Sequence, residues 1–152
     1  MFEWMIMPLK RYADFSGRSR RKEYWSFLLL NFIVYFVCIA LIMAGGVSMA
    51  EMTNPGAAAA SGPGFGFYLG FGIFAIYFLA ILIPSLAVTI RRFHDRDMSG
   101  WFFLLFLVLS MIPFVGFLAS LGMLVLMCLE GTRGPNKFGP DPKDPTSAEV
   151  FA

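Results

Sequence analysis

The residues best suited to chemistry lie in one stretch, 91–101 (RRFHDRDMSGW), between two long apolar runs. It holds three arginines, two aspartates and the single histidine of the protein. His94 and Asp95 are the residue types of an acid–base pair, because an imidazole exchanges protons near neutral pH. Charges this dense in an apolar chain must lie at a membrane–water boundary or inside a protein-lined cavity.

Catalysis and metal binding both need more than this stretch supplies. A general base needs a positioned partner and a nucleophile or water. A metal site would have to add carboxylates such as Asp141 to His94, and their spacing is not that of metal ligands. We therefore predict no catalytic residues, no metal site and no cofactor. Asp95 is expected to pair with arginines of residues 18–21 or 91–92 and so to dock one loop on another.

The arginines suggest a second kind of chemistry, the binding of phosphate. A planar guanidinium can bind two phosphate oxygens at once. If the arginines of residues 18–21 and 91–92 meet, they form a multivalent site for anionic headgroups; the alternative is that they only fix the topology by their charge. The whole predicted cytoplasmic polar cluster comprises Arg18, Arg20, Arg21, Lys22, Glu23, Arg91, Arg92, His94, Asp95, Asn136 and Asp141.

The elements that position these residues must be membrane helices. Of 152 residues, 58% are hydrophobic and 14% are charged, and the mean hydropathy is +0.70, whereas a soluble domain carries about 25% charged residues. We predict an all-α integral membrane protein, with one membrane domain over residues 1–142 and a disordered tail over residues 143–152. Basic clusters beside apolar runs are typical of topology signals, and no nucleic-acid-binding motif accompanies them, so nucleic acid is not an expected partner.

The apolar runs predict two full spans followed by a broken third segment. The first two runs are each long enough to cross the hydrocarbon core. The third is too long for one span, and turn chemistry around Pro113 divides it into a short helical hairpin. The alternative is one kinked span that leaves the C-terminus outside. The predicted helices of this small bundle, four in all, are residues 25–46, 65–90, 101–112 and 114–129. Residues 1–12 form either an interfacial helix or a poorly ordered N-terminus.

The distribution of basic residues predicts the orientation in the membrane. The linker, residues 45–64, contains no Lys or Arg, whereas the segments beyond both flanking spans are rich in them. The N-terminus and residues 91–101 are therefore expected in the cytoplasm and the linker outside. Arg133, Lys137 and Lys143 favour a cytoplasmic C-terminus as well.

Aromatic and small residues complete the predicted membrane domain. Tyr24, Trp25 and Trp101 stand at the ends of apolar runs, where aromatic side chains anchor helices at headgroup level. Three glycines recur at every fourth position and would let two helices pack closely, within this chain or in a homo-oligomer. These glycines are Gly62, Gly66 and Gly70.

Three polar motifs stand in order along the chain: FSGRSRRKEYW at 15–25, RRFHD followed by SGW within 91–101, and GTRGPNKFGPDP at 131–142. With the apolar intervals between them, they closely resemble the family known as domain of unknown function 805, small bacterial inner-membrane proteins of the YhaH type. The chain departs from the family pattern in a longer Gly/Ala linker at 45–64 and in RDM at 96–98, where members more often carry a Thr-Gly-Arg-like tripeptide. The resemblance implies an inner-membrane location and brings no activity.

Three functions therefore stay open. The leading hypothesis is a non-enzymatic membrane protein whose cytoplasmic basic loops bind anionic lipid headgroups or a membrane partner protein. The second is a subunit of an oligomeric transporter or channel, although the spans hold few ionisable groups. The third is an enzyme acting on a lipid headgroup, with His94 and Asp95 as its acid–base pair.

Overall fold

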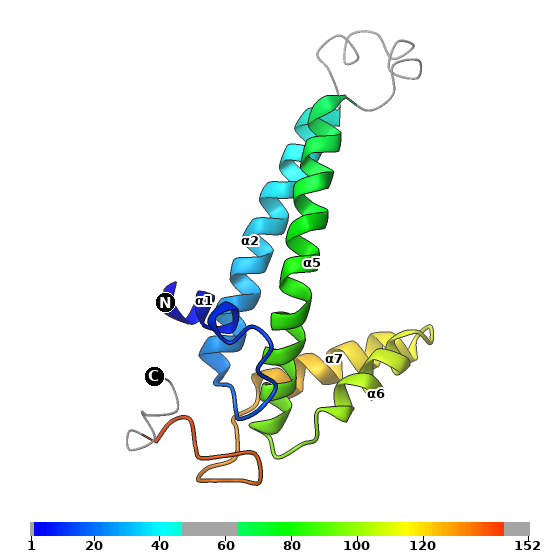
Figure 1. Ribbon diagram of the computed structural model, residues 1–152. Coiled ribbons are helices and arrows are strands. Elements are labelled where there is room, and N and C mark those ends of the chain that lie inside the picture. Colours follow the sequence, from blue (N-terminus) through cyan, green and yellow to red (C-terminus); the bar gives the residue numbers. More distant parts are fainter. Residues whose placement is uncertain (1, 47–63, 145–152) are drawn as a thin grey trace. The chain divides into compact units, whose positions relative to one another are not determined.

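The computed structural model describes residues 2–46 and 64–144, in which the regular elements are five α-helices. They are α1 (Phe2–Lys10), α2 (Arg21–Gly46), α5 (Phe65–His94), α6 (Trp101–Ser110) and α7 (Val115–Cys128) (Figure 1). The chain divides into two compact units, one made of residues 28–82 and one that joins residues 1–27 to residues 83–152. Each unit is described by itself.

Helices α2 and α5 are the two described helices that are long and apolar enough, by length and composition, to cross a membrane. Their 26 and 30 residues correspond to roughly 39 and 45 Å at 1.5 Å per residue. Both expose large apolar side chains, for example Phe32, which is 67% exposed, and Ile76, which is 73% exposed. A soluble surface rarely tolerates so much apolar area. The predicted all-α membrane fold with two full spans is therefore confirmed.

In the unit of residues 28–82, a hydrogen bond and aromatic contacts join α2 to α5. The Tyr77 hydroxyl donates a hydrogen bond to Asn31 Oδ1 at 2.8 Å, and Asn31 is buried. Tyr35 lies edge-on to the Tyr77 ring, with centroids 5.8 Å apart. An amide within a membrane span is costly unless it finds a partner, so this bond fixes how the two helices face each other.

Only part of the predicted glycine stripe can be placed in this unit. Gly62 lies outside the described residues, and Gly66 is half-buried. Gly70 is buried against Ile42 of α2, where an added Cβ would stand 2.8 Å from Ile42 Cγ1 and 3.1 Å from the Ile42 nitrogen. Gly70 thus permits the close approach of the two helices that small residues allow in membranes.

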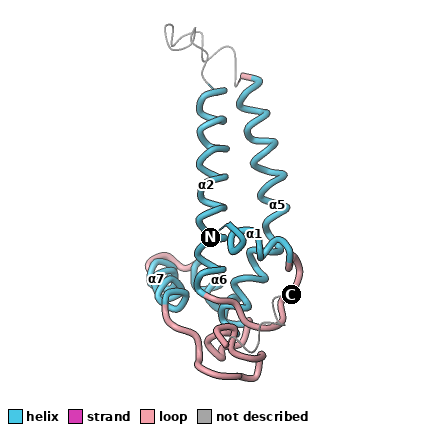
Figure 2. The backbone as a smooth tube through the Cα atoms, turned by 90° about the vertical axis from the view of Figure 1, so that its left-hand side faces the viewer, coloured by secondary structure: helices cyan, strands magenta, loops and turns pink. Residues whose placement is uncertain are grey.

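The unit of residues 1–27 and 83–152 contains the helical hairpin predicted for the third apolar run. Helices α6 and α7 pack on each other and lie crosswise to the last turns of α5 (Figures 1 and 2). Between them Pro113 precedes Phe114, which adopts a positive φ of 63°. Gly116 then passes so close to the Ser110 carbonyl that a Cβ would stand 2.5 Å from its oxygen. The turn residues and this close approach divide the apolar run into two helices.

Helix α1 is the one element missing from the predicted set of four. Residues 2–10 form a helix that includes the buried Pro8, so of the two alternatives for this segment the helix, rather than a poorly ordered N-terminus, describes the fold. Its place at the membrane interface stays a prediction. The apolar residues of this segment mix with Lys10 and Arg11, and such a short segment gives no clear periodicity from sequence alone.

The packing of Gly70 can be tested with a matched neighbour. Gly70→Ala should lower the stability of the protein by about 1–2 kcal/mol, because its methyl group would press on the α2 backbone. Gly72→Ala on the same helix meets nothing within 4 Å and should leave stability unchanged or raise it slightly. Unfolding monitored by circular dichroism in detergent micelles measures both. Equal stability of the two variants would contradict the packing described here.

Candidate functional site

A buried carboxylate at the end of α5 organises the polar residues. Asp95 Oδ1 accepts a hydrogen bond from Arg18 Nε at 3.0 Å, and Oδ2 accepts one from Arg92 Nη1. All three side chains are buried, with Arg92 fully enclosed. Charges removed from water must be paired to be tolerated, so each of these residues requires the others. We call Asp95, Arg18 and Arg92 the Asp95 cluster.

The same two arginines attach the C-terminal loop to the helix ends. Arg18 donates to the carbonyl oxygens of Thr132 and Gly134, the latter at 2.6 Å. Arg92 donates to the Leu129 carbonyl just after α7. The Asp95 backbone carbonyl in turn accepts a hydrogen bond from the Thr132 amide at 2.8 Å. The cluster therefore brings together all three polar motifs, and Arg92 supplies a donor to a carbonyl that the end of α7 leaves unpaired.

A second buried ion pair lies at the start of α2. Glu23 Oε1 accepts a hydrogen bond from Arg91 Nη2 at 3.0 Å, and both side chains are fully buried. Ser19 supports the pair by donating from its hydroxyl to Glu23 at 2.8 Å and from its amide to the Arg91 carbonyl at 3.1 Å. Among the described residues, Arg91 Nε and Nη1 have no hydrogen-bond partner. Arg91 thus ties α5 to the α2 entrance.

The histidine and the aspartate of the predicted acid–base pair have separate partners. Both Asp95 oxygens bind arginines, whereas His94 Nδ1 lies 3.3 Å from the Gly17 carbonyl oxygen. The His94 ring stacks on Phe138, with centroids 4.0 Å apart. Asn136 has a structural position, donating from its side chain to the His94 carbonyl at 2.9 Å. Within the described part of the chain, no group of three or more His, Cys, Asp and Glu residues could hold a metal ion.

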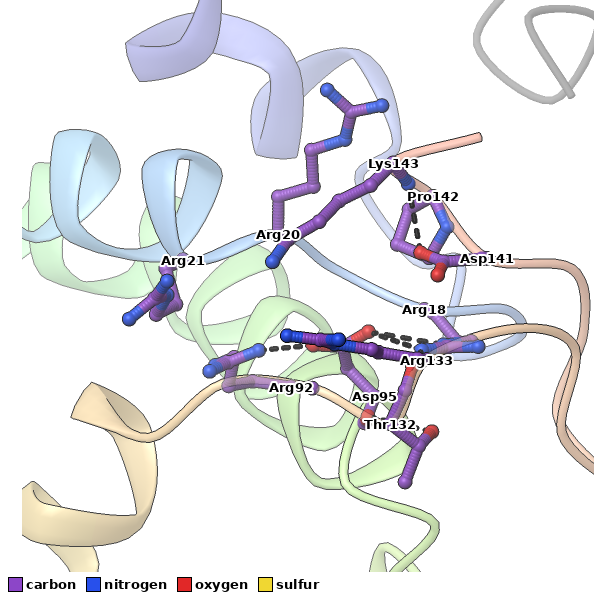
Figure 3. Close-up of a pocket in the computed structure, with 11 residues that line it drawn as sticks. Arg18, Arg20, Arg21, Arg92, Asp95, Thr132, Arg133, Asp141, Pro142 and Lys143 are labelled. Carbon is purple, nitrogen blue, oxygen red and sulfur yellow. Dashed lines mark hydrogen bonds and ion pairs between the residues drawn. The ribbon is translucent and has the colours of Figure 1, made fainter. Parts of the chain in front are cut away.

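A small pocket opens beside the Asp95 cluster, and we call it the cationic pocket (Figure 3). Its cavity of about 20 Å³ has room for roughly one water molecule. Its charged lining residues are the cations Arg18, Arg20, Arg21, Arg92, Arg133 and Lys143 and the carboxylates Asp95 and Asp141. Four of the five arginines predicted to converge are in this lining, and Arg91 is not.

The outer side chains of the cationic pocket are held by weaker contacts than the inner ones. Arg21 Nη2 lies 2.6 Å from Glu130 Oε1, and Lys143 Nζ lies 3.4 Å from the same oxygen. The Lys143 hydrogen bond and the charges of Lys143 and Arg21 lower the pKa of the exposed Glu130 carboxyl. The Arg20 guanidinium lies over the Trp4 ring at 5.7 Å. Glu130 therefore competes with any other anion for two of the pocket's cations.

Two charged lining residues were missed by the sequence reasoning. Arg133 and Lys143 were interpreted only as signals for a cytoplasmic C-terminus, yet both line the cationic pocket. Arg133 lies within the third polar motif and Lys143 directly follows it, and this placement was the available signal. Among the other predicted residues, Lys22 is exposed and outside the lining, and Trp101 is 76% exposed.

The membrane anchors predicted at the α2 entrance lie against each other. Tyr24 and Trp25 make an edge-on contact with centroids 5.5 Å apart, and both are half-buried. Because the two rings are perpendicular, Tyr24 and Trp25 present differently oriented aromatic surfaces at the first turn of α2, where anchoring side chains are expected.

A substitution at Gly131 tests the Asp95 cluster without removing any of its charges. A Cβ at this position would stand 2.0 Å from Asp95 Oδ2, and the carboxylate cannot retreat because Arg18 and Arg92 hold it. Gly131→Ala should therefore destabilise the protein by about 3 kcal/mol, the cost of breaking a buried pair. Thermal unfolding in detergent micelles measures the loss. The control is Gly122→Ala in α7, where the new methyl group makes only an ordinary 3.7 Å contact with Phe106. A Gly131→Ala protein as stable as this control would contradict the role of the cluster.

The chain is similar to known proteins over most of its length. Residues 12–140 match the family described as protein of unknown function (DUF805). The inner membrane proteins YhaI and YhaH of Escherichia coli are each 40% identical to it, over 93% of this chain and over 96% and 97% of their own lengths. The uncharacterized protein YiiR of the same organism is 26% identical over 86% of this chain and 87% of its own. No solved structure matches the chain. The chain belongs to the DUF805 family, and the predicted family resemblance is confirmed.

Proposed function

We propose that this protein is a non-enzymatic inner-membrane protein that binds the phosphate of anionic lipid headgroups in its cationic pocket, on the cytoplasmic side. The observation that carries the proposal is the lining of the pocket, which has six cationic side chains and two carboxylates. Arginine supplies most of this charge, and its planar fork matches phosphate oxygens.

The charge surplus lies on the open side of the pocket. The carboxylate of Asp95 is already shared by Arg18 and Arg92, which therefore act as a fixed floor. Of the remaining cations, Arg21 and Lys143 contact Glu130, which lies outside the lining, and Asp141 is the other carboxylate of the lining. Positive charge still exceeds negative charge when Glu130 is counted. An anion that enters here meets donors held in place by a buried framework, which reduces the entropy cost of binding.

The size of the cavity requires the outer side chains to move on binding. A volume of about 20 Å³ holds a water molecule but no phosphate group. Arg21 and Lys143 can move because their side chains are 40% and 53% exposed. Binding would then exchange their contacts with Glu130 for charge-assisted hydrogen bonds to phosphate.

The position along the chain fits a headgroup ligand. The pocket takes residues from the first turn of α2 and from the last turns of α5, the two helices long enough to span. The ends of spans lie at headgroup depth, where basic residues attract anionic lipids. The orientation proposed is the predicted one, with the N-terminus and the C-terminus both cytoplasmic.

The rival functions have less support. A lipid-headgroup enzyme would use His94 and Asp95 together, yet each binds other groups. A transporter or channel subunit, a homo-oligomer and a membrane protein partner stay predictions, and no feature of the described residues favours them over headgroup binding.

Removing the competing carboxylate should strengthen binding. Glu130→Gln frees Arg21 and Lys143, so the affinity for phosphatidylglycerol should rise about two- to fivefold, as expected for a lost surface pair. Native mass spectrometry of the purified protein titrated with phosphatidylglycerol measures this. Asp97→Asn is the matched control, because it removes the same charge from a residue whose partner, Lys137, lies outside the pocket. An equal gain in both variants would mean that net charge alone is responsible and would contradict a defined site.

Replacing an arginine by lysine separates a shaped site from simple charge anchoring. Arg21→Lys keeps the charge but loses the planar fork, so phosphatidylglycerol affinity should fall about three- to tenfold. Lys22→Gln, which removes a charge next to the pocket but outside its lining, should weaken binding less. The same titration with phosphatidylcholine should show no difference among the variants. Unchanged phosphatidylglycerol binding by Arg21→Lys would leave only the anchoring interpretation.

A further inference from the structure

A second, larger cavity lies on the same unit and shares no lining residue with the cationic pocket. It is a cleft of about 420 Å³ between the last turns of α5, the loop after them and the start of α6. Its walls are apolar side chains such as Ile90, Phe103 and Leu104, with His94 and Ser99 as the polar exceptions. Both the volume and the apolar lining with a few polar groups are typical of small-molecule sites.

The imidazole of His94 is held in one orientation. Its ring stacks on Phe138 at an interplanar angle of 4°, and Nδ1 lies 3.3 Å from the Gly17 carbonyl oxygen. A carbonyl can only accept a hydrogen bond, so Nδ1 must carry the proton in this contact. In the neutral ring Nε2 is then left as a hydrogen-bond acceptor.

That acceptor faces the cleft. His94 Nε2 lies 3.6 Å from the place where a Cβ would stand on Gly100, and both residues line the cavity. Within the described part of the chain, Nε2 has no hydrogen-bond partner. The cleft is therefore a mostly apolar space with one oriented acceptor in its wall.

Gly100 keeps the space in front of this acceptor free. A methyl group there would stand 2.8 Å from Ile90 Cγ2 as well as close to His94 Nε2. The Gly100 backbone has φ −58° and ψ −19°, a conformation open to any residue. The glycine is thus required for room and not for its backbone angles.

We propose that this cleft binds the hydrocarbon chain of a membrane amphiphile whose hydroxyl group donates a hydrogen bond to His94 Nε2. The cleft lies at the end of a helix long enough to span the membrane, and Trp101 at its edge is 76% exposed, as at headgroup level. Molecules with apolar chains are abundant there. A neutral acceptor selects a hydroxyl over a phosphate or carboxylate, because those anions offer it no proton. The occupant is therefore a long-chain alcohol or a hydroxyl-bearing glyceride.

Bromine quenching of Trp101 tests the site. The protein, with Trp4→Phe and Trp25→Phe so that Trp101 is its single tryptophan, is placed in phosphatidylcholine nanodiscs at one copy per disc. Bromododecanol should quench Trp101 fluorescence saturably, whereas bromododecane, which lacks the hydroxyl, should need about fivefold more probe in the membrane to reach the same saturable quenching. Equal saturation by the two probes, or saturation by neither, would overturn the proposal. If saturable quenching by bromododecanol disappears in nanodiscs that hold two copies of the protein, a second copy occupies the cleft. That result would also overturn the proposal.

The single histidine provides an independent measurement. In protein labelled with ¹⁵N-histidine, bromododecanol should shift the Nε2 resonance, and bromododecane should not. His94→Phe keeps an aromatic ring on Phe138 but removes the acceptor, so the affinity for bromododecanol should fall roughly fivefold, the effect of one hydrogen bond. Gly100→Ala should abolish saturable quenching by filling the space before Nε2. Unchanged phosphatidylglycerol binding by both variants shows that the unit still folds. Full bromododecanol affinity in either folded variant would refute the proposal.

Discussion

A carboxylate that is out of contact with water must be paired, and this constraint on Asp95 shapes the polar end of the molecule. Its two oxygens bind Arg18 and Arg92, and these arginines reach on to carbonyls of the loop after α7. One buried group therefore joins segments that are far apart along the chain. Removing any member leaves an uncompensated charge, which costs several kcal/mol. Because Arg18, Arg92 and Asp95 also line the cationic pocket, this pairing fixes the position of its innermost residues.

The unit contains charged residues of two kinds, enclosed and partly exposed. The fully buried pair of Glu23 and Arg91 is enclosed and joins two helix ends. The outer cations, such as Arg21 and Lys143, are partly exposed and share one exposed carboxylate, Glu130. Exposed pairs of this kind contribute little to stability, so they can be exchanged for a ligand at small cost. In the proposed headgroup site, the enclosed pairs would position the pocket and the exposed pairs would give way to the ligand.

Much of this could be predicted from sequence, where the signal is local. Apolar length predicted the two spans, and Pro113 predicted the hairpin, because turn chemistry acts over a few residues. The pairing of Asp95 with arginines followed from the rule that buried charges need partners. Which arginine serves which carboxylate did not follow, because contacts such as Arg18 to Gly134 join residues 116 positions apart. Arg133 and Lys143 were missed, and Arg91 was grouped with the pocket, for this reason.

The most direct test of a phosphate site built on the Asp95 cluster is the distance between lipid phosphorus and arginine guanidinium nitrogen. Solid-state NMR dipolar recoupling measures it in bilayers of phosphatidylglycerol with ¹⁵N-arginine-labelled protein. The account predicts a close phosphorus–nitrogen contact that weakens in Arg21→Lys, because Arg21 lines the pocket. A bilayer sample with no such contact, or with a contact unchanged by Arg21→Lys, would contradict it.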